Sequence, residues 1–328
     1  MFYIKKYHKI EEVNYEFEVV TPMFIGGDNQ NEAELRVPSI KGMLRFWWRA
    51  ISDKSTISDL KEEEGKLFGS TDEKSKIFIK IDNPDISVSK NLFNGKKFKV
   101  ETSRGTFPID ILHYLAYGPL NYVKGKGNVV IKEYIPAGEK FVLSIIAQKS
   151  VFEEIDKALS YLLTFGGIGA KSRNGFGSLY CENIQYITDF KKSGALKKYT
   201  SFSSNTRLIK FSAHKRWEDA LSEIGLAYKD ARLSLEKKHN FKRRALIAKP
   251  IEVKEEKNIP EYIKDNRHSK PYFLHVNKLP NGEYQGQILF LPYSFKPFDS
   301  NENFDKYMAA CNQMNEVIES KAGGNKWE

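Results

Sequence analysis

Residues 163–179 concentrate residue types that bind phosphate groups. Five glycines fall within twelve residues, 166–177, and a lysine, a serine, an arginine and an asparagine lie among them. Glycine lets a backbone approach a ligand closely, and successive N–H groups in such turns form a concavity that binds anions. The structural alternative is a helix C-cap followed by a bulged strand, which needs one or two glycines. We interpret this stretch as a site for a phosphate backbone, made of Gly167, Gly169, Lys171, Ser172, Arg173, Gly175 and Gly177.

The elements expected around this glycine loop exclude two common phosphate-binding loops. Residues 150–163 have apolar positions at helical spacing, and residues 176–184 have the composition of a strand. A dinucleotide fingerprint and a Walker A loop both need the order strand, glycines, helix. Here the glycines follow a helix and precede a strand, so neither motif applies.

A second set of cations lies in a helix predicted over residues 39–51, with Ser39 as its N-cap. Three cations at i, i+4 and i+8 form one stripe, and a tryptophan lies between them on the same face. Such a stripe can grip phosphates and stack a base. The alternative is a surface helix whose tryptophans pack against a neighbour; we expect Trp47 in the core and leave both options open for Trp48. The residues of this cationic stripe are Lys41, Arg45, Trp48 and Arg49.

The net charge of +10 is unevenly distributed. Of the 52 Lys and Arg and the 42 Asp and Glu, 16 and 5 lie within residues 191–249, which leaves 36 and 37 for the rest of the chain. A basic block inside a balanced chain favours a polyanionic partner, nucleic acid above all, over a surface that is merely solubilising.

Two motifs in the N-terminal half resemble a known family. Gly-Ile-Gly at 167–169 followed by Gly-Phe-Gly at 175–177 is similar to the glycine-rich signature of the RAMP superfamily of CRISPR-associated RNA-binding proteins. TPMFIGG at 21–27 and ELRVPSIKGMLRFWWRA at 34–50 closely resemble one subfamily, the first subunits of type III-B (Cmr) CRISPR RNA-guided effector complexes. The resemblance implies antiviral defence, single-stranded guide or target RNA as ligand, and other Cmr subunits as partners.

The resemblance also implies an α+β fold of two ferredoxin-like (RRM-like, βαββαβ) domains, the second degenerate. The order strand, helix, strand, strand, helix, glycine loop, strand read from residues 1–188 agrees with the first. We place the boundary in a polar segment, giving domains 1–188 and 189–328, and an insertion at 93–128 whose basic tips could reach RNA. In this fold the cationic stripe and the glycine loop should face one shared groove.

An RNA endonuclease is the alternative function, because some RAMP proteins cleave CRISPR RNA. Metal-free cleavage needs a base near the 2′-hydroxyl, commonly histidine. The motifs contain none of the six histidines, so we expect no catalytic residues and no enzyme activity. The candidates for the alternative are His214, His268 and Asp28, whose positions in the sequence are the least readily explained by a structural role. The six histidines are His8, His113, His214, His239, His268 and His275.

Composition limits the possibilities for localisation, disulfides and bound metal. Neither an apolar run of membrane-spanning length nor a secretion signal is visible in the sequence. Two lone cysteines, Cys181 and Cys311, give neither a disulfide framework nor metal-ligand spacing. The sequence therefore predicts a cytoplasmic protein that carries no metal and no cofactor.

Overall fold

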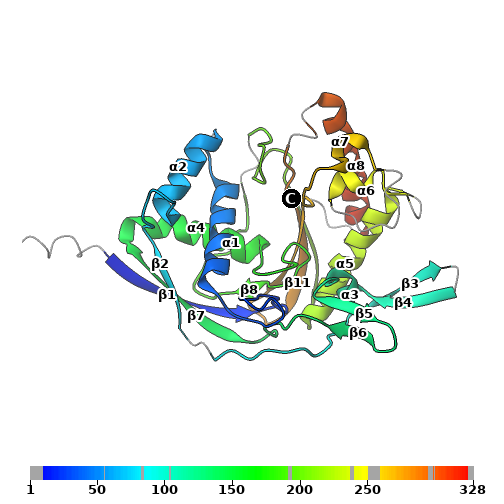
Figure 1. Cartoon of the computed structure of the whole chain (residues 1–328), viewed down its shortest axis with the longest axis horizontal. Helices are drawn as coiled ribbons and strands as arrows, with labels where there is room; N and C mark the ends of the chain where they lie inside the picture. The colour runs from blue at the N-terminus through cyan, green and yellow to red at the C-terminus, as the bar shows by residue number, and fades with distance from the viewer. Residues whose placement is uncertain are drawn as a thin grey trace, which may run out of the picture. The chain divides into compact units, whose positions relative to one another are not determined.

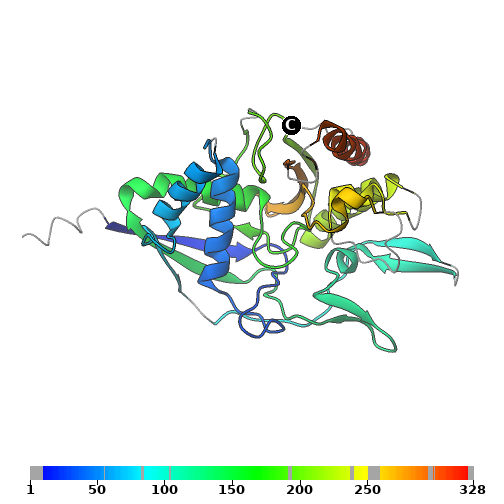
Figure 2. The same cartoon turned by 45° about the horizontal axis from the view of Figure 1, so that its top comes forward.

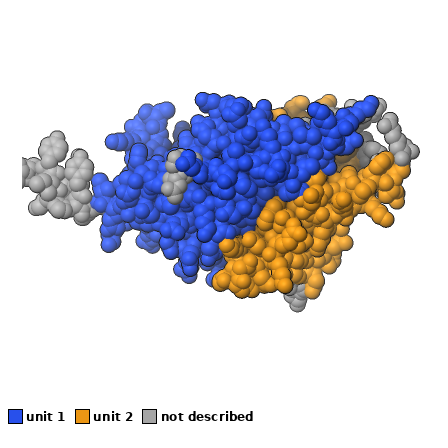
Figure 3. Space-filling model, turned by 90° about the horizontal axis from the view of Figure 1, so that it is seen from below, with its two compact units in different colours: residues 1–93, 116–190 blue, residues 94–115, 191–328 orange. Residues whose placement is uncertain are grey.

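The computed structural model describes residues 10–54, 56–82, 85–102, 105–190, 194–236, 240–249, 259–294, 298 and 300–323. His8, His239 and part of the basic block, including Lys237 and Lys238, lie outside these residues. The chain divides into two compact units, residues 1–93 with 116–190 and residues 94–115 with 191–328 (Figure 3). The domains expected from the sequence were contiguous, whereas residues 94–115 cluster with the second unit.

The first unit is built on a four-stranded antiparallel sheet. Its strand order is β2 (Phe78–Asp82), β7 (Lys140–Gln148), β1 (Ile10–Val19) and β8 (Leu179–Tyr180). Tyr15, Phe17 and Val19 are buried on alternate positions of β1, as a half-buried strand requires. The strand predicted over 176–184 is reduced to two residues, because the preceding glycine turns continue to Gly177.

Three helices cover one face of this sheet (Figures 1 and 2). They are α1 (Val37–Ile51), α2 (Ile57–Phe68) and α4 (Lys149–Phe165). α1 begins before the predicted N-cap Ser39, because Pro38 is well suited to the first helical turn and Arg36 takes the cap position. The core between helices and sheet is formed by apolar side chains at most 1% exposed, among them Leu44, Trp47, Phe141, Leu143, Ile155 and Leu162.

An aromatic cluster supports the loops at one end of the first unit. Phe24, Phe93, Tyr134 and Phe176 have ring centroids 5.4–6.3 Å apart in the contacts they share. Two short strands, β5 (Leu120–Val123) and β6 (Gly127–Val130), form a hairpin in the same unit.

The second unit has a three-stranded antiparallel sheet in the order β10 (Tyr272–Lys278), β11 (Tyr284–Phe290) and β9 (Arg207–His214). The helix α5 (Trp217–Ser234) packs against it. From α8 (Asn301–Lys321), the carbonyl of Cys311 and the amide of Asn315 accept hydrogen bonds from Tyr272 on β10. Smaller elements are α6 (Arg244–Ile247), α7 (Glu261–Lys264), α3 (Ile111–Leu115) and the hairpin β3 (Lys97–Thr102) and β4 (Gly105–Asp110).

The α+β class predicted from the sequence is confirmed, with antiparallel pairing throughout the described strands. Among the helices that the structure describes, none is both long and apolar enough to cross a membrane. Cys181 and Cys311 are buried free thiols.

Candidate nucleic-acid interface in the first unit

The body of the glycine loop is held by hydrogen bonds against residues 21–24, the segment that follows β1. The N–H of Ala170 donates to the carbonyl of Phe24 (2.7 Å), and the N–H of Gly177 donates to that of Pro22 (3.0 Å). The hydroxyl of Thr21 donates to the carbonyl of Gly175 (2.8 Å). The loop is therefore a rigid extension of the sheet.

The glycines of this body are required by contacts inside the chain. A Cβ on Gly169 would lie 2.4 Å from the Phe24 carbonyl oxygen, and one on Gly167 would lie 2.6 Å from that of Phe176. Gly169, Gly175 and Gly177 also have positive φ angles of 91°, 88° and 69°. We expected these glycines to admit a ligand; the close approach that the structure shows is between two segments of this chain.

The tip of the loop, residues 169–174, is its partly exposed portion. Lys171 has a φ of 63°, which is uncommon for a residue with a side chain, and it starts a turn closed by the Asn174 N–H donating to the Lys171 carbonyl (2.7 Å). Ser172 and Arg173 are half-buried within this turn. The Arg173 guanidinium lies 5.7 Å from the ring centroid of Phe46 on α1. The tip thus presents two cations and a hydroxyl on a fixed backbone.

The cationic stripe of α1 faces α2. Arg45 Nε and Arg49 Nη1 both donate to Glu64 Oε1, at 2.6 Å and 2.7 Å. The Glu64 side chain is only 10% exposed, so this carboxylate neutralises the stripe from within the fold. Lys41 Nζ donates to Ser75 Oγ (3.1 Å), and burial, followed by the charge of Arg45, lowers the pKa of Lys41.

Trp48 is part of the core and not a stacking platform. It is 8% exposed, its ring packs edge-on to Phe68, and its Nε1 donates to Glu154 Oε2 on α4 (3.1 Å). Of the two options that the sequence left open for this residue, packing against neighbouring elements describes its position.

The structure places part of the predicted insertion beside the tip, and the sequence analysis missed both this proximity and the exposed tyrosines there. A Cβ on Gly118 would lie 3.6 Å from the Lys171 ammonium, so the lysine reaches the segment leading into hairpin β5–β6. Tyr117 and Tyr122 in this region are 58% and 72% exposed. Lys124 and Lys126 are exposed in the hairpin turn. The sequence did contain a signal for this contact, namely aromatic residues among lysines in the predicted insertion, because bases stack on such rings.

The candidate catalytic groups lie in different settings. His214 Nε2 is 2.8 Å from Glu223 Oε2, and both side chains are about a quarter exposed (23% and 25%). His268 is 7% exposed, its Nε2 lies 3.1 Å from the Leu246 carbonyl, and burial lowers its pKa to about 4. Asp28 is exposed in the loop after Gly27. In the part of the chain that is described, His, Cys, Asp and Glu side chains form no group of three suited to a metal ion.

Residues 16–180 match the model of the RAMP superfamily, and the match includes the glycine loop and most of the first unit. The chain belongs to the RAMP superfamily.

Within this superfamily, two proteins of Pyrococcus furiosus are similar in sequence. CRISPR system Cmr subunit Cmr1-2 is 28% identical over 187 residues, which are 53% of this chain and 97% of that protein. CRISPR system Cmr subunit Cmr1-1 is 33% identical over 150 residues, which are 44% of this chain and 40% of that protein.

Two solved structures share the fold. Apo Cmr1 from Pyrococcus furiosus has a TM-score of 0.54 at 20% identity, covering 92% of this chain and 96% of that one. A chain of the type III-B Cmr-beta complex bound to cognate target RNA has a TM-score of 0.50 at 14% identity, covering 95% and 100%. At these identities the likeness shows a common antiparallel α+β fold.

Proposed function

We propose that this chain is a non-catalytic RNA-binding subunit of a type III-B CRISPR effector complex, acting in cytoplasmic antiviral defence with other Cmr subunits. The observation that carries the proposal is the loop tip, where Lys171, Ser172 and Arg173 are partly exposed on a backbone fixed to the sheet. Its position in a RAMP domain and its similarity to Cmr subunits support RNA as the ligand. Lys171 and Arg173 neutralise phosphates, and the rigid turn keeps the entropy cost of ordering them low.

The strand orders support the proposal that both units are ferredoxin-like. Counted along the chain, the strands of the first sheet lie in the order 2-3-1-4, with helices after the first and third strands. The second sheet reads 2-3-1, again with a helix after its first and third strands. A βαββαβ domain that has lost its last strand would give this pattern.

The RNA site that we propose differs in part from the one expected from the sequence. We retain the tip residues Lys171, Ser172 and Arg173, and we add Tyr122 and the lysines of hairpin β5–β6 as a neighbouring contact. The cationic stripe contributes less, because Glu64 already pairs with Arg45 and Arg49. Trp48 and the buried glycines serve the fold.

An endonuclease remains the second candidate because of one observation, the contact between His214 and Glu223. A carboxylate can orient a histidine that acts as a general base. Incubating the purified chain with labelled RNA, with Mg²⁺ or with EDTA, should leave the RNA intact. Cleavage that disappears in His214→Ala would establish the endonuclease instead.

RNA binding is tested by fluorescence anisotropy with a labelled oligouridylate at several salt concentrations. Lys171→Gln with Arg173→Gln should weaken binding about tenfold. The slope of log affinity against log salt should fall by about 1.4, since each single-strand phosphate contact contributes about 0.7.

The matched control replaces two exposed lysines outside the tip, Lys140→Gln with Lys157→Gln. It removes the same charge and should keep most of the affinity. Equal losses in the two double variants, or an affinity of the parent chain that does not respond to salt, would contradict the proposed site.

A further inference from the structure

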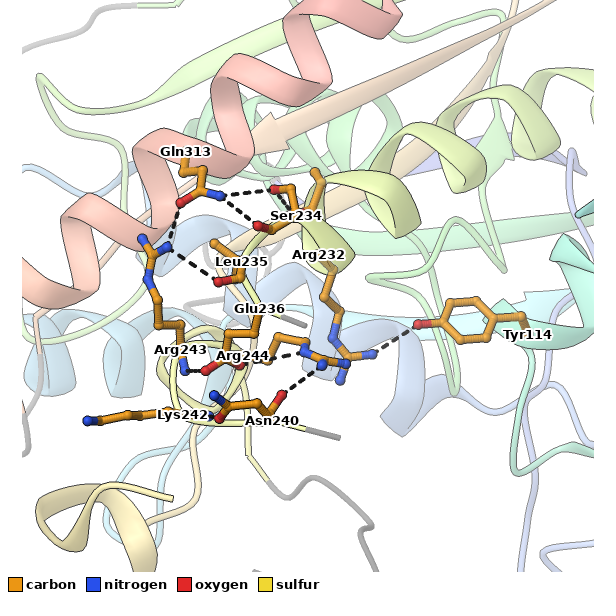
Figure 4. A network of polar contacts seen from close by, with 11 residues as sticks. Tyr114, Arg232, Ser234, Leu235, Glu236, Asn240, Lys242, Arg243, Arg244 and Gln313 are labelled. Atoms are coloured by element: carbon orange, nitrogen blue, oxygen red, sulfur yellow. Dashed lines mark hydrogen bonds and ion pairs between the residues drawn. The ribbon is translucent and has the colours of Figure 1, made fainter. Parts of the chain in front are cut away.

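Three arginines surround one carboxylate in the second unit, and we call Arg232, Arg243, Arg244 and Glu236 the arginine cluster (Figure 4). Arg232 lies in the last turn of α5, and Glu236 follows that helix. Arg243 and Arg244 lie at the start of the short α6, in the chain segment that returns to the end of α5.

The carboxylate of Glu236 accepts hydrogen bonds mainly from backbone N–H groups. Its two oxygens accept hydrogen bonds from the N–H groups of Arg243 (2.5 Å) and Arg244 (3.0 Å). Arg244 Nε lies 3.6 Å from Glu236 Oε2. With a side chain only 4% exposed, Glu236 supplies one negative charge to the whole cluster.

The other guanidinium contacts are with neutral groups. Arg232 Nη1 donates to the Tyr114 hydroxyl (3.0 Å). Arg243 Nη1 donates to Gln313 Oε1 (2.5 Å) and to the Leu235 carbonyl (3.4 Å). Within the described residues, the structure gives Arg232 and Arg243 no carboxylate partner, so these two cations lie beside Glu236 without an ion pair of their own.

Burial strengthens the effect of the positive charges in the cluster, because water screens them less. Arg244 is 8% exposed, and its guanidinium lies 4.8 Å from the Phe241 ring centroid. Burial lowers the pKa of Arg244, and the positive charge of Arg232 lowers it further. Arginine does not lose its proton at neutral pH, so the cluster keeps a positive potential that an anion would relieve.

We propose that the arginine cluster binds a backbone phosphate of RNA, so that the second unit also contacts the ligand. Guanidinium groups match the geometry of phosphate oxygens, and paired arginines favour a phosphate over a single carboxylate. At one side of the cluster, Lys242 and Asn240 are exposed and Arg243 is half-exposed. Lys242 adds a further cation at this rim. The inference rests on the proposed RNA-binding function.

The first test uses inorganic phosphate and the full chain. Phosphate should raise the melting temperature of the parent chain above its value in sodium chloride of equal ionic strength. Arg232→Gln, which keeps a donor for Tyr114, and Arg243→Gln should each lose this increase. Lys306→Gln, which removes an exposed lysine of α8 paired with Glu302, is the control and should keep it. The same phosphate response in Arg232→Gln and the parent chain would overturn the anion site.

The second test uses the labelled oligouridylate. Arg232→Gln and Arg243→Gln should each weaken RNA binding about fivefold and reduce the salt slope by about 0.7. Lys242→Gln, at the exposed rim, should show a smaller loss with an unchanged melting temperature, which separates binding from folding. Wild-type RNA affinity in all three variants would overturn the assignment to RNA.

Different outcomes would contradict the proposed function and the proposal for the arginine cluster. Loss of binding in Lys171→Gln with Arg173→Gln alone would retain the proposed function and overturn this inference. An absence of RNA binding by the parent chain would remove the proposed function and with it the RNA assignment. In that case the phosphate response alone decides whether the cluster is an anion site.

Discussion

The carbonyl oxygen of Phe24 occupies the space into which a side chain on Gly169 would project. A Cβ on Gly169 would lie 2.4 Å from this oxygen, which already accepts the N–H of Ala170 at 2.7 Å. The glycines of the loop therefore let two backbone segments pack together. In the site that we propose, the side chains of the tip bind the ligand, so the residues that fold this site differ from those that contact the ligand.

Gly169→Ala should destabilise the first unit rather than weaken RNA binding selectively. The substitution combines a positive φ of 91° with a collision against backbone, so we expect a loss of at least about 3 kcal/mol in the free energy of unfolding. Urea denaturation followed by circular dichroism measures it. Gly125→Ala is the control, because Gly125 has a φ of 83° but open space around it, and should cost only about 1–2 kcal/mol. Equal costs would show that the Phe24 contact is unimportant.

Glu64→Gln should destabilise the fold because it leaves Arg45 and Arg49 without their shared anion. The expected loss is about 1–3 kcal/mol, since one buried carboxylate accepts hydrogen bonds from both guanidiniums. Glu62→Gln, whose side chain is 63% exposed and pairs with Lys66, should cost less than about 0.5 kcal/mol in the same denaturation experiment. A similar effect of the two substitutions would mean that the stripe is not held by Glu64.

The sequence predicted the elements well, because helical and alternating apolar patterns are local properties. α4 appears where its pattern predicted it, and α1 does so with an earlier start. The α+β class followed from the element order and the RAMP motifs. The assignment of residues 94–115 to the second unit depends on contacts between distant parts of the chain, such as the Lys96 N–H donating to Ser222 Oγ (3.0 Å), and no local pattern encodes it.

The candidate site was harder to predict because helical spacing gives the face of a residue but not its partner. Lys41, Arg45 and Arg49 do lie on one face of α1, as their spacing requires. Glu64, 19 residues after Arg45, is an ordinary acid in the sequence, and only the packing of α2 brings it to the stripe. Likewise, the glycines gave a correct signal for close backbone approach, while the approaching group is Phe24.

The free energy of unfolding should fall as the pH is lowered from 7 to 5, in part because of His268. Burial lowers the pKa of His268 from 6.5 to about 4. The unfolded chain therefore binds a proton between these values that the folded chain does not, and stability present above pH 6.5 is lost as the pH falls towards 4. The expected loss between pH 7 and 5 is about 2 kcal/mol. His268→Gln should reduce this dependence in urea titrations at the two pH values; an unchanged dependence would contradict a buried neutral imidazole.

Arg45 and Arg173 differ in their surroundings although both contact aromatic rings of the first unit. The Arg45 guanidinium lies 6.0 Å from the ring centroid of Phe68 on α2 and pairs with Glu64. Arg173 lies over Phe46, which follows Arg45 by one residue and therefore points about 100° away around α1. The loop tip thus lies against a face of α1 next to that of the stripe.

Arg45→Ala and Arg173→Ala should consequently have different effects. Arg45→Ala should lower the free energy of unfolding by about 1–2 kcal/mol, because Glu64 loses a charge-assisted hydrogen bond, and should change RNA affinity less than twofold. Arg173→Ala should leave stability within about 0.5 kcal/mol and weaken RNA binding about fivefold, with a salt slope reduced by about 0.7. Urea denaturation and fluorescence anisotropy on each single variant and on the double variant measure both quantities. Additive losses, one in stability and one in affinity, are expected for the double variant, since Arg45 pairs with Glu64 whereas Arg173 lies over Phe46. If Arg45→Ala instead weakens RNA binding as much as Arg173→Ala does, with a comparable drop in salt slope, the RNA contacts both faces of α1 and the stripe belongs to the binding site.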